Sequence, residues 1–222
     1  MFCGGKMSEK PEFIDQLSCE EQEFDDLRSL KTLVFSCLNK NSFSPDEIAS
    51  YNEKNYSAEG VIDNFYQVNA GYYRGALPDV RGLEHLIEHV RIKTIIDLRF
   101  LSKKQSIKRE QAIKSAGLDY VNIPMTIFFP PAIRQVEEFL EIVNNPDNQP
   151  VYVHCLQGKD RTGIMTAIYR VVNYGYSYDS AYAEMLKFGH HAMFLPFMRM
   201  GLRKFCGNME NVYSDGVIGV AG

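Results

Sequence analysis

Residues 151–163 read VYVHCLQGKDRTG, and within this stretch the pattern of the chain changes from strand to helix. Pro150 precedes a short apolar run, 151–155, that is typical of a buried β-strand. After residue 163 the pattern is that of a helix that ends at Gly175, with one apolar side formed by Ile164, Met165, Ile168, Val171 and Val172. A polar loop therefore joins a buried strand to a buried helix.

The residue types in this loop are unlikely to occur together by chance. On the composition of this chain, a Cys followed six places later by an Arg arises by chance about one time in four. A preceding His, a Gly three places after the Cys and a Thr after the Arg lower the joint chance to the order of 1 in 100,000. The combination therefore indicates a function.

A loop that leads into a helix N-terminus can cradle a tetrahedral anion, because its backbone N–H groups and the helix dipole point at one place. The same field lowers the pKa of a thiol and favours Cys155 as a nucleophilic thiolate. Arg161 can hold two phosphate oxygens in its planar fork. The predicted phosphate-binding residues are Leu156, Gln157, Gly158, Lys159 and Arg161, with His154 and Thr162 in support.

HCLQGKDRTG resembles the signature loop of the cysteine-dependent protein tyrosine and dual-specificity phosphatases. The resemblance spans about Phe65 to Phe188, because YYRGALP (72–78), IKTIIDLR (92–99) and YSYDSAYAEMLKFG (176–189) are similar to segments of compact atypical dual-specificity phosphatases. It implies a three-layer α/β/α domain with a mixed central sheet. It also implies a phosphocysteine formed on Cys155, phosphate bound by Arg161 and the loop amides, and no metal or other cofactor.

One family feature is missing from this chain. The resemblance leads us to expect a general-acid Asp about 30 residues before the cysteine, but the segment from Ile123 to Pro131 contains no carboxylate. We expect Asp160 to supply the proton, since its Gly-Lys-Asp-Arg setting resembles the loop of the myotubularin lipid phosphatases. Asp119 and Asp97 are poorer candidates because they lie at strand positions.

Alternating patterns elsewhere support an α/β class. We expect a hairpin around Asn69-Ala70-Gly71, strands at 92–98 and 119–123, and helices at 83–90, 103–116, 130–143, 177–188 and 190–204. Residues 61–206 form the predicted phosphatase domain. Residues 1–60 form a predicted helical extension, and 207–222 a flexible tail.

The charge of the chain is divided unevenly. Residues 1–60 carry 12 acidic and 6 basic side chains, whereas 61–222 carry 16 acidic and 18 basic ones. An acidic extension is thus attached to a mildly basic body. Neither part has the clustered basic stripe of a nucleic-acid-binding protein.

The five cysteines lack C-x-x-C spacing, so neither a disulfide framework nor a zinc site is indicated. We expect a cytoplasmic protein without a transmembrane segment; removal of a signal peptide before the first residue would leave the same sequence. The oligomeric state stays open.

Several other residues receive a structural interpretation. Asp97 is expected to form a salt bridge, and Arg74 and Arg99 are expected to play structural parts. His190-His191 is expected to start a helix rather than to bind a metal. The Met and Phe residues between 193 and 200 are expected to pack rather than to contact a cofactor.

These features predict a phosphomonoester hydrolase that acts through a Cys155 phosphocysteine. Lys159 adds charge to the cradle and favours a highly anionic substrate, an inositol polyphosphate or a phosphoinositide. A protein tyrosine or dual-specificity phosphatase is the alternative. A phosphate-binding pseudophosphatase is the alternative of another class, since the usual acid is missing.

Overall fold

The structure is a computed structural model that describes residues 60–193 and 195–212. Five strands form one sheet in the order β1-β2-β5-β3-β4. They are β1 (Tyr66–Asn69), β2 (Tyr72–Gly75), β3 (Thr94–Arg99), β4 (Asp119–Met125) and β5 (Val151–His154). β1 and β2 are antiparallel and form the predicted hairpin, and every other pair is parallel. The sheet is therefore mixed, as the resemblance implied.

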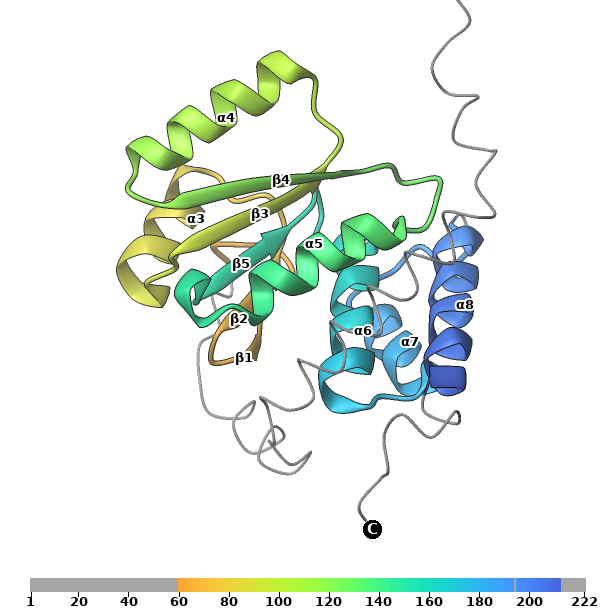
Figure 1. Cartoon of the computed structure of the whole chain (residues 1–222). Coiled ribbons are helices and arrows are strands. Elements are labelled where there is room, and N and C mark those ends of the chain that lie inside the picture. The colour runs from red at the N-terminus through yellow and green to blue at the C-terminus, as the bar shows by residue number, and fades with distance from the viewer. Residues whose placement is uncertain (1–59, 194, 213–222) are drawn as a thin grey trace, which may run out of the picture.

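Helices connect the strands and follow the last of them (Figure 1). They are α3 (Val80–His85), which continues as the π-helix η2 (Leu86–Val90), α4 (Lys103–Ser115), α5 (Ile133–Asn144), the 3-10 turn η3 (Pro146–Asn148), α6 (Asp160–Tyr174), α7 (Tyr178–Lys187) and α8 (Pro196–Val212). α6 ends where Gly175 adopts a left-handed conformation with φ of 64°, as its sequence predicted.

Two apolar cores cover the two faces of the sheet. The larger core lies between the sheet and helices α5 to α8 and contains Phe139 and Ile168. The smaller core lies against α3, η2 and α4 and contains Leu86 and Ile113. Successive residues Ile95 and Ile96 of β3 belong to different cores because side chains alternate along a strand. The predicted three-layer α/β/α fold is confirmed, with α4 and α5 on opposite sides of the sheet in Figure 1.

The topology places one loop at the middle of the sheet edge. β5 lies between β2 and β3, with His154 next to Gly75 and Asp97 in the parallel register. The carboxyl ends of parallel strands are the edge at which α/β folds bind ligands. The residues after His154 therefore begin in a central position on that edge.

The end of the domain differs from the sequence prediction. His190-His191 does not start a helix: Gly189, with φ of 79°, ends the α7 turn, and α8 begins only at Pro196, a residue suited to a first helical position. α8 continues to Val212, so the expected boundary at residue 206 falls inside a helix. The helices expected within 1–60 lie outside the described residues, as does most of the predicted tail.

Candidate active site

Hydrogen bonds to the carbonyl groups of the loop after β5 fix its position. Three successive carbonyls accept hydrogen bonds from distant residues: Leu156 O from the Leu77 N–H at 3.1 Å, Gln157 O from Asn64 Nδ2 at 2.8 Å and Gly158 O from Arg74 Nη2 at 2.6 Å. A peptide's N–H points away from its C=O. Anchoring the carbonyls outward therefore turns the amides toward the centre of the loop, where an anion would bind.

Only glycine fits at position 158. Its φ is +70°, and a Cβ there would lie 2.5 Å from the carbonyl carbon of Gly75 and 2.6 Å from its oxygen. Those atoms belong to the backbone of β2, so no side chain can rotate away. This position therefore requires glycine.

Arg74, which the sequence predicts to play a structural part, supports the loop after β5. Its side chain is fully buried, donates to Gly158 O and lies 4.1 Å from the ring centroid of Phe188. Together with Asn64 it supports the loop from residues 84 and 93 positions away. No local pattern marks either residue, because the contact exists only once β1, β2 and β5 are aligned.

Cys155 lies at the base of the loop and is nearly buried. Burial alone would raise the pKa of its thiol, but the hydroxyl and backbone N–H of Thr162, the charge of Arg161 and the Gly158 N–H lower the pKa below its ordinary value. Thr162 Oγ1 is buried and has no oxygen or nitrogen partner in the described part of the chain, so it is available to the sulfur. The environment favours a thiolate, as predicted.

Arg161 reaches across the loop to the end of β4, two strands away from β5 in the sheet. Its Nη1 donates to Met125 O at 3.3 Å, at the end of β4. Its Nε is buried and makes no hydrogen bond to the described residues. The guanidinium thus has one end anchored and retains donors for an anion bound in the loop.

His154 orients the start of the loop as a neutral side chain. Burial lowers its pKa to about 4, and its Nδ1 donates to Cys155 O at 2.9 Å. Its Nε2 is 3.9 Å from Asp97, but a neutral imidazole forms no ion pair there. Asp97 pairs instead with Arg99, whose Nη2 is 2.6 Å from Asp97 Oδ2, which confirms the predicted salt bridge.

Asp160 does not fit the role of proton donor. Its Oδ1 accepts from His190 Nδ1 at 2.7 Å and from the His191 N–H at 2.9 Å, and its Oδ2 accepts from His191 Nδ1 at 2.8 Å. Although burial opposes it, these hydrogen bonds lower the pKa of Asp160 to about 2. An ionised carboxylate has no proton to give, so the expectation is corrected: Asp160 anchors the start of α6 to the segment after α7.

Three further loop residues were predicted to bind phosphate. Leu156 and Gln157 are exposed, and the aliphatic part of Lys159 packs over Gly189, where a Cβ would lie 3.4 Å from Lys159 Cε. All the loop residues predicted from sequence are thus brought together. Asn64, Arg74, His190 and His191 are the residues that sequence reasoning missed or assigned otherwise.

No group of three or more His, Cys, Asp and Glu residues that could hold a metal ion occurs among the described residues. Within the same part of the chain, no helix is both long and apolar enough to cross a membrane.

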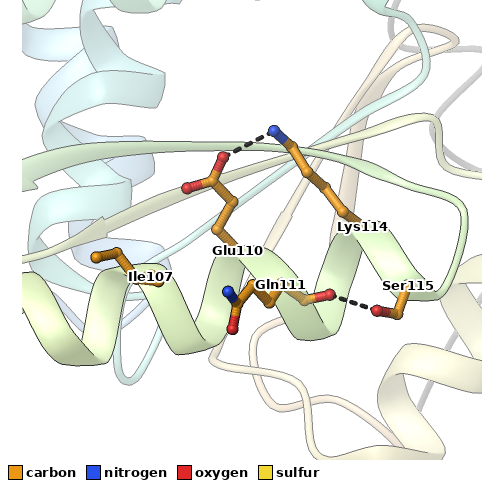
Figure 2. A pocket seen from close by; sticks show the side chains of 5 residues that line it. All are labelled: Ile107, Glu110, Gln111, Lys114 and Ser115. Atoms are coloured by element: carbon orange, nitrogen blue, oxygen red, sulfur yellow. Dashed lines mark hydrogen bonds and ion pairs between the residues drawn. The ribbon is translucent and has the colours of Figure 1, made fainter.

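A surface depression of about 540 Å³ lies along α4, where Glu110 pairs with Lys114 and the Ser115 hydroxyl donates to the Gln111 carbonyl (Figure 2). It shares no residue with the loop after β5.

Comparison with known proteins gives the family. The model of a family described as "DSP-PTPase phosphatase fused to NAD+ Kinase" matches residues 45–193, which include every element from β1 to α7. The chain belongs to this family of DSP-PTPase phosphatases.

Curated relatives of this DSP-PTPase include NAD kinase 2, chloroplastic, of Arabidopsis thaliana, which is 33% identical over 105 residues, or 46% of this chain and 11% of the relative. Inositol diphosphatase SIW14 of Saccharomyces cerevisiae is 33% identical over 119 residues, or 49% of this chain and 39% of the relative. The chain therefore spans less than half the length of these relatives.

Solved structures share the fold of this DSP-PTPase. The core catalytic domain of the PP-IP phosphatase SIW14 from S. cerevisiae aligns with a TM-score of 0.55 at 22% identity, covering 70% of this chain and 93% of that one. TpbA of P. aeruginosa in complex with pTyr aligns with a TM-score of 0.55 at 19% identity, covering 71% and 99%.

Proposed function

We propose that this domain hydrolyses phosphate from inositol phosphates through a phosphocysteine on Cys155. One observation carries the proposal. A buried cysteine of lowered pKa lies at the base of a loop in which three successive carbonyls accept hydrogen bonds from residues outside the loop. A thiolate surrounded by inward amides and an arginine is suited to attack on phosphorus.

The reaction proceeds in two steps. The Cys155 thiolate attacks phosphorus, the S–P bond forms, and the P–O bond to the leaving group breaks with its electron pair going to that oxygen. Arg161 and the loop amides stabilise the charge on the other three phosphate oxygens. Water then attacks the phosphocysteine, phosphate leaves, and the electrons of the S–P bond return to sulfur, where Thr162 stabilises the thiolate.

The leaving group decides how much acid catalysis is needed. Asp160 is ionised and 123–131 has no carboxylate, so a leaving group that is stable without a proton is favoured. A phosphate group has a second pKa of about 6, whereas the phenol of tyrosine has a pKa of about 10. Diphosphorylated inositol phosphates, which release a phosphate-bearing inositol, therefore fit this site best. The names of the SIW14 and DSP4 relatives, both inositol diphosphatases, support this substrate class.

Lys159 supports a polyanionic substrate independently of the leaving group. It lies in the loop, and the end of its side chain, the ammonium included, lies beside Gly189. Lys159→Ala is expected to raise KM for a polyphosphorylated inositol about tenfold while KM for p-nitrophenyl phosphate changes little, since one charge contact is worth about 1–2 kcal/mol. Equal changes for both substrates would contradict this role.

The deciding experiment measures phosphate release from diphosphorylated inositol phosphates, inositol polyphosphates, phosphoinositides and phosphotyrosine peptides. Cys155→Ser is expected to abolish release, and Cys206→Ser, which changes another buried cysteine, to preserve it. No release from any substrate would favour the pseudophosphatase. Preferential release from the peptides would favour a protein tyrosine phosphatase. Equal release by Cys155→Ser would remove Cys155 as the nucleophile.

A further inference from the structure

Large apolar side chains are exposed at one edge of the domain. Phe100 follows β3 and is 71% exposed, and Phe128 and Phe129 follow β4 and are 63% and 58% exposed. Met193 precedes α8 and is 85% exposed, and Phe197 lies in the first turn of α8 and is 52% exposed. Single exposed apolar residues are ordinary on protein surfaces. Several Phe and Met side chains in three neighbouring segments are not.

Three contacts bring these segments together beside the loop after β5. Arg99, which precedes Phe100, is paired in register with Met125, at the end of β4. Arg161 of the loop donates to the same Met125 carbonyl. Pro130 packs so closely against Gly201 that a Cβ on Gly201 would overlap it. Figure 1 shows the segment between β4 and α5 near the start of α8.

We call the apolar rim the exposed residues Phe100, Ile127, Phe128, Phe129, Met193, Phe197 and Met200. The rim is embedded in positive charge. The segments 99–109, 125–134 and 190–205 together contain nine Lys and Arg residues and no Asp or Glu, in a chain in which acidic residues outnumber basic ones. Seven of the nine are exposed: Lys103, Lys104, Lys108, Arg134, Arg199, Arg203 and Lys204.

Two carboxylates next to these segments are paired. Asp97 is held by Arg99, and Asp160 by His190 and His191. The rim therefore offers aromatic and thioether groups beside exposed Lys and Arg side chains. A polar rim with aromatic anchors would suit a protein partner, but apolar side chains among Lys and Arg, with no acidic residue between them, match the interface of an anionic bilayer.

We propose that the apolar rim docks this domain on the surface of an anionic membrane, with Phe128 and Phe129 entering the boundary between head groups and acyl chains. The neighbouring Lys and Arg residues then contact the anionic head groups. The loop after β5 opens beside the rim, at the level of the head groups. The proposal concerns where the domain binds, and it stands or falls independently of the substrate named above.

The test is co-sedimentation of the full chain with vesicles of phosphatidylcholine alone and of phosphatidylcholine with phosphatidylserine. We expect binding to the anionic vesicles only, weakened by added salt. Phe128→Ser and Phe129→Ser should each lower the vesicle partition coefficient about tenfold, because each removes a Phe from the apolar phase. Ile107→Ser on α4 is the matched control, since Ile107 is 44% exposed and lies outside the rim; it should bind as the wild type does.

Thermal unfolding of each variant checks that it folds, and Phe197→Ser from α8 provides an independent variant if one of the first two does not. Absence of binding to anionic vesicles would overturn the proposal, as would equal binding by the wild type and the rim variants. A second copy of the chain is the other possible occupant. If the wild type is a dimer in solution and the rim variants are monomers, the rim is an interface between copies and not a membrane surface.

Discussion

The substitution Gly158→Ala tests whether the geometry of the loop governs both folding and phosphate binding. Gly158 has φ of +70°, and the added Cβ would lie 2.5 Å from the carbonyl carbon of Gly75 and 2.7 Å from the Ala76 nitrogen. Ordinary contact begins at about 3.4 Å, so the loop and β2 must separate by roughly 1 Å. β2 cannot yield readily because it is paired with β1 on one side and β5 on the other.

Two costs follow from this geometry. The left-handed conformation costs an alanine about 1 kcal/mol relative to glycine. Displacement of the loop breaks the hydrogen bond from Arg74 to Gly158 O and leaves that buried guanidinium without its partner, which costs about 2 kcal/mol more. We therefore expect the free energy of unfolding to fall by about 3 kcal/mol. A displacement of roughly 1 Å at the reacting centre should lower kcat/KM about 100-fold.

Gly117→Ala separates strain from steric overlap. Gly117 has φ of +81°, but nothing lies within 4 Å of the position of its Cβ. This variant should lose only about 1 kcal/mol of stability and keep its activity. The measurements are urea denaturation, kcat/KM with p-nitrophenyl phosphate, and competitive inhibition by inorganic phosphate. If Gly158→Ala keeps kcat/KM within about threefold of the wild type, or behaves as Gly117→Ala does, the argument that backbone approach fixes the loop is refuted.

Three further predictions concern single side chains. Thr162→Val removes a group that lowers the pKa of Cys155, so the acid limb of kcat/KM and the pH dependence of Cys155 alkylation should both move to higher pH; unchanged profiles would show that Thr162 does not act on the sulfur. The pKa of Asp160 is lowered to about 2, so Asp160 contributes stability above its ordinary pKa and loses it as pH falls toward 2. Asp160→Asn should therefore cost about 2 kcal/mol in urea denaturation at pH 7, with a smaller difference near pH 3. It should leave the alkaline limb of turnover in place; loss of that limb would restore Asp160 as the acid, because a general acid must be protonated to act. Asp97→Asn should cost about 3 kcal/mol in chemical denaturation because it leaves Arg99 without its buried partner, and a loss below about 1 kcal/mol would mean that solvent screens the pair.

Most elements of the fold and the centre of the candidate site can be predicted from the sequence. β5, the loop and α6 are contiguous between 151 and 174, so the nucleophile, the arginine and the helix N-terminus are local in the chain. Apolar runs marked the parallel strands, and Gly175 marked the end of α6. After α7 the local pattern predicts the wrong helix start, at His190-His191 instead of Pro196.

Which groups hold the loop, and whether Asp160 is ionised, depends on contacts between residues far apart in the sequence. Arg74 and Asn64 meet the loop across separations of 84 and 93 residues, which no periodicity records. Asp160 was a reasonable acid in sequence, yet it becomes an ionised anchor because His190 and His191, 30 and 31 positions later, donate to both its oxygens. The exposure of Phe128 and Phe129 was equally hidden. Whether an apolar side chain packs or faces solvent depends on what the rest of the fold places against it, and hydrogen bonds and burial between distant segments are set only when the chain has folded.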